Sequence, residues 1–229
     1  MLSVLYFGSF NPLHLGHVAI AKYVLSLPEV EHFRFIVSPK SPFKEIETLQ
    51  NANERLVALS NSIKKLNEHN GVITKVLHNY NIAKVLHNYN STSTNNSSSN
   101  SANNNCYNTT PLQELLQKPL SHNKRFEVSN IEFTLPSPLY TCNTILEIKK
   151  NEPNNKFVLL MGSDNILSFE KWYNYKEILK NCQIWVYPRE GYESTEICKK
   201  LGARLLNGST INISSTLIRS CTDFTDWKF

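Results

Sequence analysis

Apolar residues follow two alternating patterns along this chain. Short continuous apolar runs predict strands at residues 2–7, 33–37, 156–161 and 183–187, with further extended segments at 126–133 and 203–206. Apolar residues at intervals of three and four predict helices at residues 14–27, 54–66, 141–150, 172–180, 194–201 and 214–220. Because strands alternate with helices, we expect a Rossmann-like α/β fold, a mainly parallel sheet with helices on both faces. Such a fold binds ligands at the carboxyl ends of its strands.

One segment interrupts this alternation. Of the 23 residues from 88 to 110, 19 are Asn, Ser or Thr, and the heptapeptide KVLHNYN occurs just before them at 75–81 and again at 84–90. Such a composition buries too little apolar surface to offset the entropy of ordering the segment. We therefore expect one domain over residues 1–229, interrupted by a low-complexity Asn/Ser-rich insertion at about 69–124, which a surface loop tolerates. An Asn-rich interaction protein is an alternative that rests on this insertion alone.

Composition and charge exclude several classes of protein. The net charge of +5 is small for a nucleic-acid binder, and the 41% of hydrophobic residues include no run long enough to span a bilayer. Residues 1–7 are apolar but lack the basic start of a signal peptide. Five cysteines without a CxxC pair are typical of reduced thiols. We expect a cytoplasmic protein with no nucleic-acid or membrane partner. Whether the chain forms a homo-oligomer stays open.

The junction between the first strand and the first helix carries the densest set of chemically useful residues. Its sequence, GSFNPLHLGH at residues 8–17, places Gly8 where the strand ends and Gly16 where the helix begins. Gly8 allows a sharp turn, and Gly16 lets a ligand approach the helix amides. A helix N-terminus attracts anions, and His14 and His17, three residues apart, would face the same anion. The segment therefore predicts a phosphate site.

Other interpretations of this segment are weaker. A plain turn with two surface histidines would explain any one of these residues but not the whole set. A zinc site lacks an obvious third ligand, and the GxxxxGK[ST] pattern of a P-loop is absent. We therefore expect no protein-bound metal site here.

The last predicted helix, at 214–220, begins within the segment ISSTLIR at residues 213–219. Ser214 or Ser215 is a natural N-cap, and Arg219 lies about one turn further on. By itself this is an ordinary capped surface helix.

The two motifs together resemble the nucleotidylyltransferase superfamily. The segment 8–17 is similar to its G-x-F-x-P-x-H-x-G-H signature, and 213–219 is similar to the element with which these enzymes hold the ATP phosphates. The superfamily includes adenylyltransferases for nicotinate mononucleotide, phosphopantetheine and flavin mononucleotide, and several cytidylyltransferases. The signature is specific to the superfamily and carries little information on the acceptor.

Segments in the middle of the chain resemble the bacterial-type nicotinate mononucleotide adenylyltransferases in particular. The matching segments are IVSP at 36–39, PFK at 42–44, NERL at 53–56, SPLYT at 137–141, MGSDN at 161–165, KWYNY at 171–175 and PREGY at 188–192. The sequence departs from the family at Leu139, where Ser often precedes Tyr-Thr, and in the insertion. The chain also ends at Phe229, where the family's pattern continues into a further helix.

The resemblance implies roles for individual residues. Catalytic roles fall on His17, His14 and Arg219. ATP binding falls on Gly8, Ser9, Phe10, Gly16, Asp164, Arg189, Ser214, Ser215 and Thr216. Acceptor binding falls on Asn11, Lys44, Tyr140, Thr141, Trp172 and Tyr173.

The chemistry of the acceptor residues agrees with these roles. A pyridinium ring stacks on aromatic faces, and a carboxylate accepts from hydroxyl and amide donors. Two alternatives stay open: that Trp172 and Tyr173 are plain core aromatics, and that Asp164 is a plain helix cap.

The implied reaction joins nicotinate mononucleotide and ATP, with Mg²⁺ as cofactor, to give nicotinate adenine dinucleotide and pyrophosphate in NAD biosynthesis. The partners would be ATP and nicotinate mononucleotide. Nicotinamide mononucleotide is the first alternative acceptor, followed by phosphopantetheine and flavin acceptors. A non-catalytic nucleotide-binding module is the alternative from another class.

Overall fold

The molecule is built on a six-stranded parallel sheet. The computed structural model describes residues 2–39, 51–72 and 115–208. The strand order is β3-β2-β1-β4-β5-β6, and every neighbouring pair is parallel. The strands are β1 (Leu2–Gly8), β2 (His32–Val37), β3 (Arg125–Ser129), β4 (Lys156–Gly162), β5 (Gln183–Tyr187) and β6 (Arg204–Leu205). The α/β Rossmann-like prediction is confirmed.

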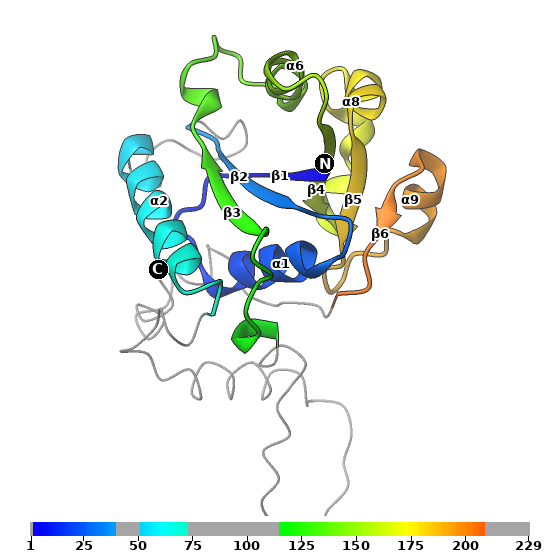
Figure 1. Cartoon of the computed structure of the whole chain (residues 1–229). Coiled ribbons are helices and arrows are strands. Elements are labelled where there is room, and N and C mark those ends of the chain that lie inside the picture. The colour runs from blue at the N-terminus through cyan, green and yellow to red at the C-terminus, as the bar shows by residue number, and fades with distance from the viewer. Residues whose placement is uncertain (1, 40–50, 73–114, 209–229) are drawn as a thin grey trace, which may run out of the picture.

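Helices cover both faces of this sheet (Figure 1). The helices are α1 (Leu15–Ser26), α2 (Ala52–Glu68), α6 (Thr141–Asn151), α7 (Ser163–Ile166), α8 (Tyr175–Asn181) and α9 (Thr195–Leu201). Alternate residues of β1 enter different cores, with Val4 in the core that contains α1 and α2, and Leu5 in the core that contains α6 and α8. In Figure 1, α6 and α8 accordingly lie above the strands and α1 lies below them.

Two predicted elements differ from the observed ones. The extended segment 126–133 ends as a strand at Ser129, and Ile131–Phe133 form a 3₁₀ turn, η2. The helix expected at 172–180 begins only at Tyr175, because Asn174 adopts a left-handed conformation (φ 49°, ψ 40°) that a continuous helix excludes. Trp172 instead ends the 3₁₀ turn η3 (Phe169–Lys171). The helix predicted at 214–220 lies outside the described residues.

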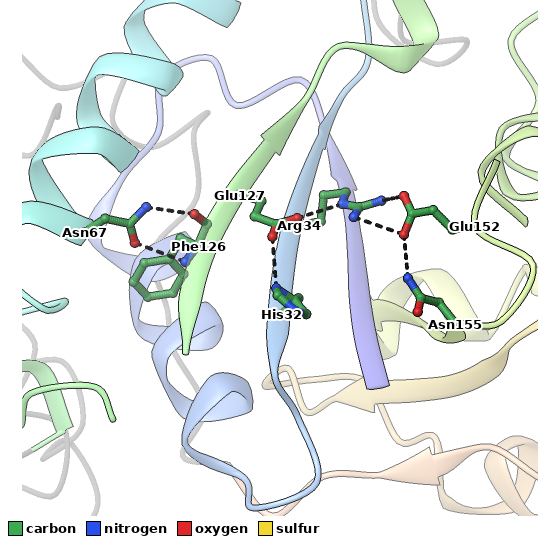
Figure 2. Close-up of polar contacts among 7 residues, drawn as sticks. All are labelled: His32, Arg34, Asn67, Phe126, Glu127, Glu152 and Asn155. Atoms are coloured by element: carbon green, nitrogen blue, oxygen red, sulfur yellow. Dashed lines mark hydrogen bonds and ion pairs between the residues drawn. The ribbon is translucent and has the colours of Figure 1, made fainter. Parts of the chain in front are cut away.

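A network of ionic contacts joins strands β2 and β3 to the end of helix α6, toward the amino-terminal ends of the strands (Figure 2). Arg34 Nε on β2 donates to Glu127 Oε2 on β3 at 3.1 Å, and its Nη1 donates to Glu152 Oε1 after α6 at 2.7 Å. His32 Nδ1 lies 2.9 Å from the other oxygen of Glu127. The hydrogen bond from Arg34 holds the pKa of Glu152 below its usual range. The half-buried Arg34 thus ties the β2–β3 pair to the end of α6.

The outer edge of β3 is closed by one side chain. Asn67 on α2 donates from Nδ2 to the carbonyl of Phe126 at 2.8 Å and accepts from the Phe126 amide at 3.1 Å, as Figure 2 shows. These two bonds replace those of a neighbouring strand. Helix α2 is therefore docked along the sheet edge in a fixed register.

Helix α1 also holds both described ends of the predicted insertion. The Lys22 ammonium is buried and donates to the carbonyls of Gly71, Leu116 and Lys118 at 2.6, 2.9 and 2.8 Å. Burial lowers the pKa of Lys22 to about 8. Leu116 packs in the main core, so residues near both ends of the insertion belong to the packed domain. The extent of the insertion stays a prediction, since residues 73–114 lie outside the described part.

The described helices and cysteines add two facts. Cys142, Cys182 and Cys198 are buried and free, and burial raises the pKa of Cys182 to about 12. Among the described residues, no helix combines the length and apolar character that crossing a membrane requires.

We predict that Lys22→Met lowers the free energy of unfolding by about 2–4 kcal/mol, because three carbonyls, two of them in buried hydrogen bonds, lose their donor. Urea unfolding followed by circular dichroism measures this loss. Lys64→Met, at an exposed position of α2, is the matched control and should change stability by less than about 0.5 kcal/mol. Equal stability of the two variants would contradict the role of Lys22.

Candidate active site

The phosphate-binding segment begins where β1 ends. Gly8 does not take the turn conformation itself, because the positive φ in this segment, 44°, belongs to Phe10. The Phe10 ring folds back over Gly8, so a Cβ at position 8 would lie 3.0 Å from the ring. Gly8 is therefore needed for close packing of Phe10, a different reason from the sharp turn that the sequence suggested.

The two histidines lie together at the start of α1. His14 is the N-cap residue, and its ring stacks on that of His17 with centroids 3.6 Å apart. The His14 backbone N–H donates to His17 Nδ1 at 3.4 Å. A nitrogen that accepts a hydrogen bond carries no proton, so the neutral His17 ring has its proton on Nε2. The helix start thus fixes His17 as an Nε2–H donor.

The remaining residues of this segment support the loop. Asn11, His14 and Gly16 are buried, whereas His17 is half-buried. The Phe10 ring contacts the His17 ring edge-to-face, with centroids 5.2 Å apart. The first turn of α1 contains no acidic residue, so no carboxylate of this turn neutralises the partial positive charge at the helix N-terminus. The structure therefore brings Gly8, Phe10, His14 and His17 into one cluster.

A second cluster lies at the end of β4. Asp164, in the short helix α7, pairs with Arg189 after β5, with Arg189 Nη1 3.0 Å from Asp164 Oδ2. Gly162 makes room for this pair, since a Cβ there would lie 2.4 Å from Asp164 Oδ1. The Ser163 hydroxyl accepts from the Arg189 amide at 2.7 Å, which fixes the backbone of Arg189 next to Asp164. Asp164 is thus held in an ion pair, which a plain helix cap does not require.

Tyr6 connects the two clusters. Its ring lies 6.1 Å from that of His17, and its hydroxyl is influenced by the charges of Arg189 and Asp164. Burial raises the pKa of Tyr6 to about 12, with Asp164 adding to this rise and Arg189 opposing it. Tyr6 therefore stays a neutral hydroxyl at ordinary pH. Tyr6 was not predicted as a site residue from the sequence, because a tyrosine inside an apolar strand is expected in the core.

A cleft of about 140 Å³ opens beside the pair of Asp164 and Arg189, and Tyr6, whose ring contacts that of His17, forms part of its wall. It is lined by residues of β1, β4 and the loops that follow β4 and β5, including Tyr6, Gly162, Asp164, Trp172 and Arg189. The cleft therefore lies at the carboxyl ends of β1 and β4. This is where the strand order reverses, and doubly wound sheets bind ligands at that point.

The three aromatic residues predicted to bind the acceptor lie in two separate ring pairs. Tyr140, the N-cap of α6, stacks on Tyr173 with centroids 4.3 Å apart and an interplanar angle of 20°. Trp172 packs on Phe169 and lines the cleft. Tyr173 is 50% exposed, so it is not a plain core aromatic. Thr141 begins α6 beside this pair.

Five predicted site residues lie outside the described part of the chain. These are Lys44, Ser214, Ser215, Thr216 and Arg219. Their roles stay predictions.

Arg55 is a further residue near the site that was not predicted from the sequence. It is buried, and its guanidinium donates to the carbonyls of Ser9, Ser38 and Pro39. It therefore joins the loops that follow β1 and β2. The available signal was its position four residues before Leu59, on the apolar stripe of the helix, where a charged residue is unexpected.

Comparisons with known proteins agree with this geometry. Residues 5–221 match the model of the cytidylyltransferase-like family. Proteins named "Probable nicotinate-nucleotide adenylyltransferase" match from Flavobacterium psychrophilum (30% identity, covering 94% of this chain and 83% of the relative) and Cytophaga hutchinsonii (26%, 94% and 83%).

Two solved structures share the fold. Plasmodium falciparum nicotinic acid mononucleotide adenylyltransferase matches in its complex with APC (TM-score 0.60, 15% identity, covering 98% of this chain and 89% of that one). Its complex with NaAD matches with a TM-score of 0.59 at 15% identity, covering 96% and 82%. The family match spans most of the described fold and both site clusters, so this chain belongs to the cytidylyltransferase-like family.

Proposed function

We propose that this chain is a nicotinate-nucleotide adenylyltransferase, which joins nicotinate mononucleotide and ATP into nicotinate adenine dinucleotide and pyrophosphate. The observation that carries this proposal is the stacked histidine pair at the N-terminus of α1, beside a cleft between β1 and β4 that contains Asp164, Arg189 and Trp172. The names of the curated relatives support the choice of acceptor.

The reaction needs no protein nucleophile. An oxygen of the acceptor phosphate attacks the α-phosphorus of ATP, a new P–O bond forms, and the bond to the bridging oxygen breaks as pyrophosphate leaves. The attacking oxygen is already anionic, so the protein contributes positioning and charge stabilisation. In this proposal His17 Nε2–H and the first amides of α1 donate to the α-phosphate, and His14 supports them.

Other residues bind the substrates in this proposal. Arg189 attracts nucleotide phosphates, and its pairing with Asp164 holds it at the mouth of the cleft. Ser214, Ser215, Thr216, Arg219 and Lys44 are assigned to phosphates by the motif resemblance. The Tyr140–Tyr173 stack and Trp172 offer aromatic faces for the pyridine ring, and the α6 N-terminus attracts its carboxylate.

Mg²⁺ would reach the site together with ATP. Among the described residues, no group of three or more His, Cys, Asp or Glu side chains is arranged to hold a metal ion. Phosphate oxygens and water commonly supply most ligands of Mg²⁺ in such sites. The ion would neutralise charge on the leaving pyrophosphate, while the protein residues orient the two nucleotides.

The histidine assignment predicts the behaviour of two variants. His17→Asn keeps an oxygen that can accept from the His14 amide but lacks the Nε2 donor, so we expect kcat to fall by about 10²–10³ with an unchanged unfolding temperature. His17→Gln, which can place an amide N–H near the Nε2 position, should retain more activity than His17→Asn. Pyrophosphate release under saturating ATP measures both rates.

His122→Ala, at an exposed position, is the control and should leave kcat unchanged. A near-wild-type rate for His17→Asn would contradict the role of the Nε2 donor.

The proposed acceptor predicts a preference between two pyridine mononucleotides. A carboxylate that accepts charge-assisted hydrogen bonds gains about 1.5–3 kcal/mol, so kcat/KM should be roughly 10–100-fold higher for the nicotinate than for the nicotinamide form. Pyrophosphate release with MgATP and each acceptor, side by side, measures this ratio. A preference for the amide would overturn the assigned acceptor but keep the chemistry, whereas ATP binding without release in either case would favour a non-catalytic module.

A further inference from the structure

Glu132 is a buried carboxylate that the mechanism above does not use. It lies in the 3₁₀ turn η2 after β3 and is 3% exposed. It accepts hydrogen bonds from the Thr144 hydroxyl at 2.9 Å and from the Ser38 hydroxyl. Burial raises its pKa, although the two hydroxyl donors lower it. Burying a carboxylate costs free energy unless hydrogen bonds compensate for the lost water. The two hydroxyl donors therefore hold Glu132 in place.

One partner belongs to the phosphate side of the site. Ser38 directly follows β2, and its amide donates to the carbonyl of Gly8 at 2.9 Å. The Ser38 carbonyl accepts from Arg55 Nη1 at 3.1 Å, and the same nitrogen donates to the carbonyl of Ser9. Ser38 is therefore fixed to the segment that leads into the histidine pair.

The other partner belongs to the aromatic side of the site. Thr144 is fully buried in the first turn of α6, and its amide donates to the Tyr140 carbonyl at 3.3 Å. Tyr140 in turn stacks on Tyr173. Glu132 thus hydrogen-bonds the turn of α6 that holds the aromatic pair, and Figure 1 shows the segment after β3 running across to α6.

We propose that Glu132 is a positioning residue that sets the spacing between the phosphate loop and the aromatic end of the acceptor site. This inference rests on the proposed function. A pyridine mononucleotide must place its phosphate near the N-terminus of α1 and its ring near the N-terminus of α6 at the same time. ATP does not need that second contact, so an error in the spacing affects acceptor use more than ATP use.

The acceptor-specific effect is tested with Glu132→Ala. We expect KM for nicotinate mononucleotide to rise at least about tenfold and kcat to fall, while KM for ATP stays within about twofold, since misplacement of reacting groups by 1 Å can cost about 10²-fold. Thr144→Val, which removes one of the two donors, should shift the same parameters in the same direction by a smaller factor.

A conservative variant separates shape from charge. In Glu132→Gln the amide oxygen can accept from Thr144 and the amide N–H can donate to the Ser38 oxygen, so both links persist. We therefore expect Glu132→Gln to keep acceptor KM within about threefold of wild type. Glu147→Ala, which removes a surface carboxylate of α6 that pairs with Lys150, is the matched control and should change neither KM.

Amide hydrogen exchange gives a readout that does not depend on activity. Exchange at Ser38 and in residues 141–145 should rise at least about tenfold in Glu132→Ala and stay unchanged in Glu147→Ala. Unchanged exchange in Glu132→Ala would overturn the link, and so would raised exchange with equal effects on both KM values or on neither. Failure of the wild type to release pyrophosphate would instead contradict the proposed function, and hydrogen exchange would still decide whether Glu132 joins the two segments.

Discussion

The reversal of strand order at β1 is the constraint on which the site depends. Strand β1 pairs with β2 on one side and β4 on the other, and the helices that cover the sheet on those two sides pack on opposite faces. The segments that follow β1 and β4 therefore separate above the sheet and leave a crevice. Asp164 and Arg189 line this crevice, and Tyr6 connects it to the ring of His17 at the start of α1.

Much of the fold could be predicted from the sequence, because β1, β4 and β5 are short apolar runs buried on both faces. In two places the local backbone conformation differs from the one that the apolar pattern predicts. Asn174 turns left-handed between Tyr173 and the start of α8, and Ile131–Phe133 form a 3₁₀ turn although the run from β3 continues to look extended. A periodicity argument cannot detect either change, since both depend on single backbone angles.

The candidate site was predictable to a different extent. The motif at 8–17 located the histidine pair, because its residues are contiguous and all act at one helix start. Tyr6, Arg55 and Glu132 were not assigned, because each is recognised only by its distant partners: Tyr6 by Arg189, Arg55 by Ser38, and Glu132 by Thr144. Polar residues buried between segments far apart in sequence become informative only when the fold is known.

We propose that this site transfers the adenylyl group directly, by positioning the two nucleotides and stabilising charge, without a protein nucleophile. The most direct measurement is the stereochemistry at the α-phosphorus, using ATP in which one α-phosphate oxygen is replaced by sulfur in a single configuration. One in-line displacement by the acceptor phosphate inverts that configuration in the dinucleotide product, which is the result we predict. Retention would require two displacements through an adenylylated side chain and would contradict a site that works without a protein nucleophile.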